Sequence, residues 1–373
     1  MAPGPPEGCR AAVATAPGTT EYRDLPLPDV GPDDGLLRVE AAGICGTDWE
    51  LYLRESRGRG LGPLVLGHEN VGRIVALGER AAERWGVAAG DRVAVEEFLP
   101  CGTCRLCRGG AYRLCEATDS RGGRPFLRYG STPVTVPPGL YGGFSQYLYL
   151  HPRAILYPVG DLPAELATLF VPVANGIRWV LERGGLRIGQ TVVVQGPGQH
   201  GLGCAVAARQ GGAGTVIVVG TPSDTARLGV ASRLGADHVI VAGEADPVEA
   251  VMDLTGGAGA DMVVDLAPGA AATVEHALAM SAKQGTVVLA ASKHGKPVTG
   301  FEHDTVVRKE LTLVGVRGHD HRSVEPAIGL IRSDRFPLRL LCTHGFGLDE
   351  VDHALRVAGA RLDPEAIHVS ILP

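Results

Sequence analysis

The feature that most constrains the fold is an alternation of strand-like and helix-like segments between residues 191 and 314. Parallel strands need long crossover connections, which are usually helices, so this pattern predicts a parallel sheet with helices on both faces. The predicted strands cover residues 191–195, 215–219, 237–241, 261–266, 285–290 and 311–314, and the predicted helices cover residues 202–210, 225–234, 247–254 and 271–281.

The flanking segments have a different character. Residues 1–160 are rich in turns and carry short β-type runs with little helical periodicity, which predicts a mostly β domain with long loops. After about Gly315 the chain again has only short strand-like and helix-like segments, and we expect residues 316–373 to pack onto the first domain. The predicted fold class is therefore α/β, with an α/β domain over residues 161–315 set into a β domain.

Composition excludes several functions. The chain has 373 residues, 45% of them hydrophobic and 20% charged, which suits a globular protein with two cores. A net charge of -6 argues against nucleic acid as a partner. No apolar run is expected to reach the ~20 residues that span a bilayer, and the first residues do not resemble a secretory signal. We expect a cytoplasmic protein with no membrane partner.

A glycine-rich loop follows the first predicted strand of the α/β domain. Gly196, Gly198 and Gly201 have the G-x-G-x-x-G spacing, and a helical stretch begins at Leu202. The first glycine allows a tight turn, the second lets the backbone approach a pyrophosphate, and the third lets helix and strand pack closely. The context predicts a dinucleotide site formed by Gly196, Gly198, Gly201 and Leu202, and a purely structural glycine turn is the alternative.

The end of the second predicted strand bears on which nicotinamide cofactor is used. An NAD site usually carries an acid there to hold the ribose hydroxyls, but this strand ends in Gly220 and Thr221. Arg227, one helical turn on, is placed to meet the 2′-phosphate of NADP, although Asp224 is within reach of a ribose. The pattern favours NADP and leaves NAD open.

Four cysteines, Cys101, Cys104, Cys107 and Cys115, crowd into one short segment. Four thiolates at this spacing suit a tetrahedral zinc ion with no open coordination position, which makes the site structural. A bacterial iron–sulfur run would have three residues before its last cysteine and a proline after it, whereas here seven residues intervene and Glu116 follows. We predict a structural zinc lobe over residues 97–118.

A second set of metal-ligand types lies nearer the start of the chain. Cys45 lies in the segment GICGTD, and His68 and Glu69 lie in GHENVG. A thiolate, an imidazole and a carboxylate are a plausible zinc set. Each taken alone has an ordinary structural explanation, since isolated cysteines are usually small buried groups.

Taken together, these motifs resemble the zinc-containing medium-chain dehydrogenase/reductase superfamily, which includes alcohol, sorbitol and threonine dehydrogenases. The resemblance covers nearly the whole chain. It implies a GroES-like β domain, formed from both ends of the chain, around a Rossmann domain, and a homodimer or homotetramer. Its motifs are GICGTD at 43–48, GHENVG at 67–72, GDRV at 90–93, the four-cysteine lobe, GGFSQY at 142–147, GPGQHG at 196–201 and KELTLVG at 309–315.

The resemblance also implies roles for single residues. Cys45 and His68 match the ligands of a catalytic zinc, and Glu69 matches a glutamate that is either a ligand or a neighbour of the ligands. Thr47 matches the hydroxyl that passes the alcohol proton away from the metal, and Asp48 a carboxylate that orients the site. The expected reaction is zinc-assisted oxidation of a small or polyol-type alcohol, or the reverse carbonyl reduction.

Two positions depart from the family pattern. Val171 stands where relatives place one more cysteine or carboxylate ligand, and valine cannot coordinate zinc. Glu50 stands where many relatives place the histidine that ends the proton relay, so it is either a carboxylate base or a solvated residue. These departures leave two alternatives: a zinc-free NADPH-dependent reductase of quinones or double bonds, and a non-catalytic cofactor-binding protein.

Residues that border the substrate pocket are harder to predict. Trp49, Leu51 and Tyr52 are candidates, as is the segment 117–140. The arginines of this segment, Arg121, Arg124 and Arg128, would suit a polar or anionic substrate. The alternative is a solvated surface loop.

Overall fold

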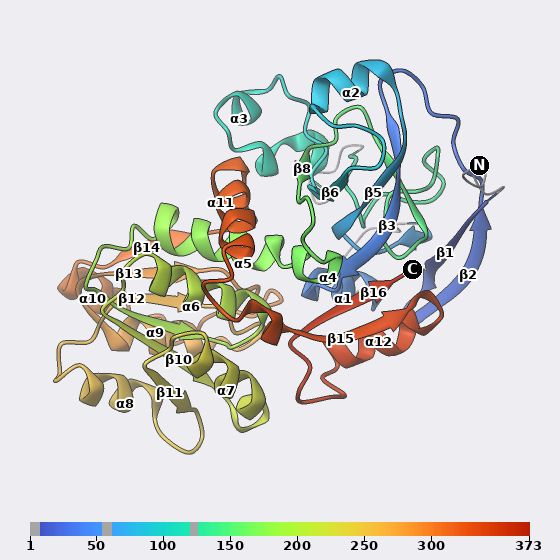
Figure 1. The fold of residues 1–373 in the computed structure, drawn as a ribbon. Coiled ribbons are helices and arrows are strands. Elements are labelled where there is room, and N and C mark those ends of the chain that lie inside the picture. The colour runs from blue at the N-terminus through green and yellow to red at the C-terminus, as the bar shows by residue number, and fades with distance from the viewer. Residues whose placement is uncertain (1–7, 54–61, 120–125) are drawn as a thin grey trace. The chain divides into compact units, whose positions relative to one another are not determined.

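The computed structural model describes residues 8–53, 62–119 and 126–373. The chain forms two compact units (Figure 1). The first comprises Met1–Phe170 and Cys342–Pro373, and the second comprises Val171–Leu341. The boundaries expected from the sequence lay at residues 160/161 and 315/316.

The second unit has the predicted parallel sheet. Its six strands run in the order β11-β10-β9-β12-β13-β14, and every neighbouring pair is parallel. Chain order reverses at β9, where a doubly wound sheet binds its ligand. The strands are β9 (Thr191–Gln195), β10 (Thr215–Gly220), β11 (His238–Val241), β12 (Ala260–Asp265), β13 (Ser281–Leu289) and β14 (Thr312–Gly315), and the helices that follow or connect them are α6 (Gln199–Gln210), α7 (Thr225–Arg233), α8 (Pro247–Leu254), α9 (Ala272–Met280) and α10 (His303–Lys309).

Residues 316–341 belong to this second unit, although the sequence analysis assigned them to the first domain. Helix α11 (His321–Arg332) buries an apolar face and packs on the π-helix η3 (Ile177–Arg183). Arg178 forms a buried ion pair with Asp320 at 3.3 Å, and the indole of Trp179 donates to the carbonyl of Gly318 at 3.0 Å. These contacts fix the segment to η3, and local sequence patterns do not reveal them.

The first unit is predominantly antiparallel. Its main sheet has the order β15-β16-β3-β5-β6-β8, with β7 also paired to β3, and a smaller sheet has the order β2-β1-β4. Pairing of β16 with β3 joins the last residues of the chain to residues 35–43. The strands are β1 (Cys9–Ala16), β2 (Thr19–Leu25), β3 (Gly35–Gly43), β4 (Leu64–Val65), β5 (Glu69–Leu77), β6 (Arg92–Val95), β7 (Tyr147–Leu150), β8 (Leu156–Pro158), β15 (Cys342–Gly347) and β16 (His368–Leu372).

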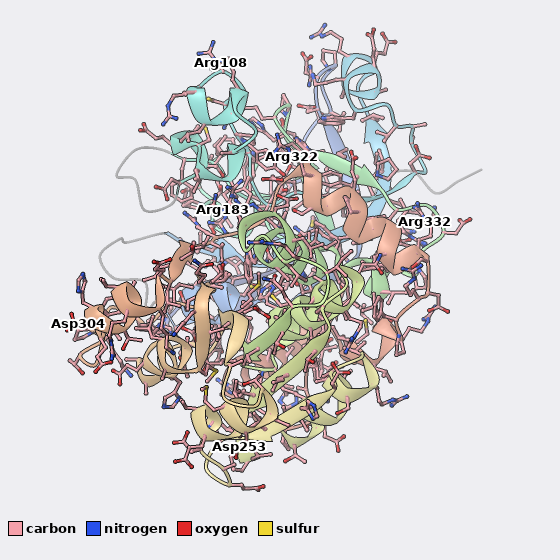
Figure 2. All side chains as sticks on the ribbon, turned by 90° about the vertical axis from the view of Figure 1, so that its left-hand side faces the viewer. Arg108, Arg183, Asp253, Asp304, Arg322 and Arg332 are labelled. Carbon is pink, nitrogen blue, oxygen red and sulfur yellow. The ribbon has the colours of Figure 1, made fainter. Side chains whose placement is uncertain are left out.

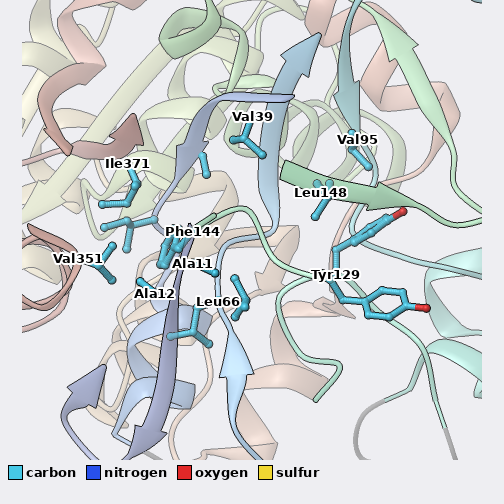
Figure 3. Packing of buried hydrophobic residues seen from close by; sticks show 14 of the residues in the cluster. Ala11, Ala12, Val39, Leu66, Val95, Tyr129, Phe144, Leu148, Val351 and Ile371 are labelled. Carbon is cyan, nitrogen blue, oxygen red and sulfur yellow. The ribbon is translucent and has the colours of Figure 1, made fainter. Parts of the chain in front are cut away.

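The helices of the first unit are short. The core between them and the sheets is formed by aliphatic and aromatic side chains, among them Val39, Phe144 and Leu148 (Figure 3). Ile371 of β16 packs into the same cluster, so the chain's last strand completes this core. The helices are α1 (Gly46–Tyr52), α2 (Glu79–Trp85), α3 (Arg105–Arg108), α4 (Ala164–Ala167) and α12 (Val351–Gly359), and α5 (Phe170–Gly176) spans the boundary to the second unit.

Charged side chains lie mainly on the outside. In the second unit, Asp253 on α8 and Asp304 on α10 project away from the sheet (Figure 2). This distribution is the usual one for a globular α/β domain.

One helical stretch corrects the expectation about apolar runs. Among the described residues, Ala164–Arg183 is long and apolar enough to cross a membrane by length and composition alone. However, 83% of its most apolar window is buried inside the protein, as in a core helix.

His151, which follows β7, makes the stability of the first unit depend on pH. Burial lowers the pKa of His151 from 6.5 to about 4, and the nearby Arg153 contributes in the same direction. The ring Nδ1 also accepts a hydrogen bond from the backbone N–H of Arg153 at 3.0 Å, which requires it to be unprotonated. Between pH 4 and pH 6.5, residue 151 therefore carries a proton in the unfolded chain but not in the folded chain.

Stability should therefore fall as the pH drops below 6.5, by at most about 1.4 kcal/mol per pH unit because solvent screens this partly exposed ring, and level off near the folded pKa. We expect His151→Asn, which keeps an acceptor for the Arg153 amide, to lose less stability between pH 7 and pH 5. Urea unfolding at both pH values measures the difference, with His303→Asn at an exposed position as the control. Parallel pH profiles for wild type and His151→Asn would contradict the assignment.

Candidate functional site

Asp48 organises the candidate metal site in the first unit. Helix α1 begins directly after Cys45, and one carboxylate oxygen of Asp48 accepts the backbone N–H of Cys45 at 2.9 Å. The other oxygen accepts the N–H of Gly67 at 3.0 Å and lies 3.2 Å from Nδ1 of His68. Asp48 is fully buried and thereby ties the start of α1 to the start of β5.

This arrangement orients the His68 ring in the way that a metal ligand needs. When Nδ1–H donates to Asp48, the other ring nitrogen, Nε2, keeps its lone pair. The thiol of Cys45 hydrogen-bonds the His68 side chain, and Sγ of Cys45 lies within 4.8 Å of a Glu69 carboxylate oxygen. The structure thus places Cys45 beside both His68 and Glu69, and a thiolate, an imidazole and a carboxylate are donor types that zinc takes.

Burial and neighbouring charged groups shift the pKa values of Cys45 and His68. Burial raises the pKa of the Cys45 thiol, more than its hydrogen bond with His68 lowers it. Burial lowers the pKa of His68, but the charges and hydrogen bonds of Asp48 and Cys45 outweigh it and raise the pKa well above its ordinary value. A bound cation would favour the thiolate and the neutral imidazole, so metal affinity should weaken at low pH.

Glu97, which no sequence motif indicated, is a buried carboxylate 3.9 Å from Nε2 of His68. The Arg128 guanidinium forms a close ion pair with this carboxylate and lies 4.8 Å above the ring of Phe98. Arg128 is therefore buried and paired, which corrects the expectation of a solvated loop at this residue. Arg121 and Arg124 lie outside the described residues.

Residues of α1 divide between the candidate site and the core. Thr47 and Glu50 are partly exposed and lie about one turn apart on the helix. Tyr52 does not border a pocket, because it is buried and its hydroxyl lies within hydrogen-bond distance of the Gly18 carbonyl oxygen and the Asp352 carboxylate, which share its one proton. Trp49 packs so closely on Gly359 that a Cβ there would lie 2.1 Å from the indole. Leu51 packs against the core of the first unit.

The four-cysteine cluster has the geometry of a closed metal site. The ligand atoms of Cys101, Cys104, Cys107 and Cys115 lie within 4.8 Å of one another, and all four cysteines are free of disulfides. Two measured sulfur separations are 3.9 and 3.5 Å, close to the ~3.8 Å edge of a tetrahedron with 2.3 Å zinc–sulfur bonds. Backbone N–H groups of Cys101, Cys104 and Cys107 donate to the sulfurs. The residues present fit zinc.

The thiols of this lobe are unequal without a metal. A hydrogen bond from the Thr103 hydroxyl lowers the pKa of Cys101 to about 6, whereas burial raises the pKa of Cys107 to about 12. Four adjacent thiolates repel one another, so all four ionise together only around a cation.

The glycine loop of the second unit has the geometry that its spacing predicts. Gly196 has a φ of +102°, and a Cβ on Gly201 would lie 1.9 Å from the Gly196 carbonyl oxygen. Gly198 caps α6, and a Cβ there would meet open space, which leaves the backbone accessible to a ligand. The side chain of Leu202, a predicted cofactor-binding residue, is fully buried, and its N–H donates to the carbonyl of Gly198.

The end of β10 is held by a buried acid. The N–H and the hydroxyl of Thr221 both donate to Asp224, and Arg227 pairs with the same carboxylate at 3.1 Å. Asp224 thus closes the capping box at Thr221, directly after the strand, and its carboxylate is engaged there. Gly220 approaches the glycine loop closely, since a Cβ there would lie 3.0 Å from the Pro197 ring.

His200, inside the glycine loop, belongs to a buried polar network that the sequence analysis did not find. Its Nδ1 lies 3.3 Å from the Asn175 amide nitrogen, and the Asn175 oxygen lies 3.2 Å from Nδ1 of His319. Trp179 packs on the His200 ring with centroids 5.6 Å apart. The residues are distant in sequence, so no local pattern could have indicated their contacts.

Comparisons with known proteins agree with this architecture. Residues 31–161 match the family model for the alcohol dehydrogenase GroES-like domain, and residues 201–333 match the model for zinc-binding dehydrogenases. The "Probable alcohol dehydrogenase adh" of Mycobacterium tuberculosis is 44% identical over 98% of both chains. The erythritol/L-threitol dehydrogenase of Mycolicibacterium smegmatis is 32% identical over 99% of this chain and 98% of its own.

A solved structure shares the fold along nearly the whole chain. It is a protein from Sinorhizobium meliloti 1021, bound to NADP, with a TM-score of 0.83 and 27% sequence identity. The match covers 98% of this chain and 99% of the other.

Proposed function

Because the chain belongs to the zinc-containing medium-chain dehydrogenase/reductase superfamily, we propose that it is a zinc-dependent, NADP-linked dehydrogenase of a small or polyol-type alcohol. The relatives support an oxidoreductase that acts on CH–OH groups. The observation that carries the zinc part of the proposal is the position of Cys45 beside His68 and Glu69, with Cys45 and His68 both held by Asp48.

A zinc ion held by these residues would supply a Lewis acid that polarises the substrate oxygen, and the nicotinamide would accept or return the hydride. Asp48 keeps Nε2 of His68 available as a ligand and fixes the start of α1, where Thr47 lies. Thr47 accepts the hydroxyl proton of the substrate and passes it outward, and Glu50, on the same side of α1, receives it. The burial of Asp48, His68 and Glu69 keeps water from the ligand atoms.

Two findings support NADP over NAD. Asp224 lies at the end of β10, but its carboxylate is buried, accepts from Thr221 and is paired with Arg227, which offsets the charge that would repel a 2′-phosphate. In addition, a structural relative is bound to NADP. The glycine backbone at 196, 198 and 201 would hold the pyrophosphate, and Gly220, Thr221 and Arg227 would lie at the adenosine ribose.

Replacing Arg227 should separate the two cofactors. We expect Arg227→Gln to raise the Kd for NADPH roughly tenfold or more, because a charge-assisted contact to phosphate is lost, and to change the Kd for NADH by less than about twofold. Binding is measured by the fluorescence of the reduced cofactors, with the exposed Arg233→Gln as the control. Equal losses for both cofactors would mean that Arg227 serves only to hold Asp224.

The decisive experiment for the metal is zinc content together with chelation. Protein purified without chelator should carry about two zinc ions per chain, one in each cluster. Mild chelation should remove the zinc at Cys45, His68 and Glu69 first, abolish alcohol oxidation and leave binding of NADPH intact. Addition of zinc should then restore the activity.

Val171 favours a second candidate, a zinc-free NADPH-dependent reductase of quinones or double bonds, because it removes a ligand position of the family. That enzyme would carry about one zinc per chain and keep its activity after chelation. A non-catalytic cofactor-binding protein would bind nucleotide without turning over any alcohol or carbonyl. We also propose a cytoplasmic homodimer or homotetramer with no nucleic-acid or membrane partner.

A further inference from the structure

A chain of buried polar side chains extends from Glu69 through His368 to Thr168. Nδ1 of His368, the first residue of β16, lies 3.9 Å from Oε2 of Glu69. Nε2 of His368 lies 2.7 Å from the hydroxyl oxygen of Thr168. All three residues are fully buried. The proposed reaction gives His368 and Thr168 no role, yet burying three polar groups is unfavourable unless they engage one another.

The hydrogen bonds of Thr168 fix the orientation of the imidazole. The Thr168 hydroxyl donates its one proton to the carbonyl of Glu165 at 2.6 Å. It must therefore accept from His368, so Nε2 of His368 carries a hydrogen. The ring is held at its Nε2 side by the end of α4, and its Nδ1 side faces the Glu69 carboxylate.

Strand register places these groups at one level of the sheet. Gly43, at the end of β3, pairs with Glu69 of β5 on one side and with Ser370 of β16 on the other. A Cβ on Gly43 would lie 2.5 Å from Oε2 of Glu69 and 2.7 Å from Cε1 of His368. The φ of Gly43 is not positive, so this glycine is needed for space and not for its backbone conformation.

We propose that His368 is a positioning residue for Glu69: Thr168 anchors its ring, Gly43 leaves room for it, and the ring packs against Oε2 and restricts the carboxylate to the rotamer beside Cys45. This inference rests on the proposed function. A free glutamate side chain has many rotamers, and a group that fixes one of them raises metal affinity. The effect matters in this chain because Val171 supplies no ligand.

The test measures the metal directly. His368→Leu removes both ring nitrogens, Thr168→Val removes the anchoring hydroxyl at nearly constant shape, and His368→Gln retains an amide donor towards Thr168. His344→Leu is the matched control, because His344 lies in the same unit on β15 and interacts with Asp363. For each full-length protein, zinc per chain, the zinc Kd by chelator competition and the visible spectrum of the cobalt-substituted protein are measured.

We expect His368→Leu and Thr168→Val to keep the four-cysteine zinc but to weaken the other metal site by about 10- to 100-fold, with altered cobalt bands. His368→Gln should recover part of the affinity, and His344→Leu should match wild type. Gly43→Ala, which crowds the same two side chains, should resemble His368→Leu. If His368→Leu fails to fold, Thr168→Val decides the question.

Two results overturn the inference in distinguishable ways. If wild type binds about two zinc ions and the His368 and Thr168 variants retain its Kd and cobalt spectrum, His368 does not position Glu69, and the zinc mechanism stands. If wild type binds about one zinc ion and no second cobalt, the proposed function fails, and this inference fails with it.

Discussion

Replacing His68 with alanine is expected to lower kcat/KM for alcohol oxidation by on the order of a thousandfold or more. The imidazole is a neutral ligand already oriented by Asp48, and alanine removes the ligand and leaves the Asp48 carboxylate without this contact. Because the substitution leaves the glycine loop at residues 196–201 unchanged, binding of NADPH should change by less than about twofold. Steady-state kinetics and cofactor fluorescence measure the two effects.

His353→Ala is the control, because His353 is an exposed histidine on α12 of the same unit. It should leave turnover near the wild-type rate. Zinc content adds a second readout, since His68→Ala should lose about one zinc per chain. Turnover within a few-fold of wild type would exclude the zinc mechanism and favour the zinc-free reductase.

Replacing Cys107 with serine is expected to destroy the zinc lobe over residues 97–118. Structural zinc sites contribute about 10–16 kcal/mol of apparent binding free energy in zinc-finger peptides, and three thiolates hold the ion far less well than four. The variant should lose about one zinc per chain, melt at a lower temperature and become open to trypsin at Arg105 and Arg108. These arginines lie on the short helix α3, which begins at the cluster.

Cys342→Ser tests whether the effect belongs to the lobe. Cys342 lies on β15 and donates to the Glu165 carbonyl at 3.5 Å, away from the four-cysteine cluster. It should keep both zinc ions and the wild-type digestion pattern. Retention of zinc and trypsin resistance by Cys107→Ser would show that the cluster is not a structural metal site.

The candidate residues differ in how much of their role can be predicted from the sequence and how much only from the structure. The donor types at Cys45, His68 and Glu69 were visible as motifs, and the structure adds the contacts of Asp48 that bring them together. Arg227 was predicted from its distance after the strand, but its buried pairing with Asp224 became apparent only in the fold. Glu97 was overlooked because its partners, His68 and Arg128, lie in other segments.

The sequence by itself determined the α/β class, the order of the parallel strands along the chain, the dinucleotide loop and the four-cysteine lobe. All of these follow from periodicity, turn residues and ligand spacing, which act over a few neighbouring residues. Only the tertiary structure decided that residues 316–341 pack on η3, that Tyr52 and Leu202 are core residues, and that His368 meets Glu69. Those outcomes depend on strand register and side-chain packing between segments far apart in the chain, which no local pattern records.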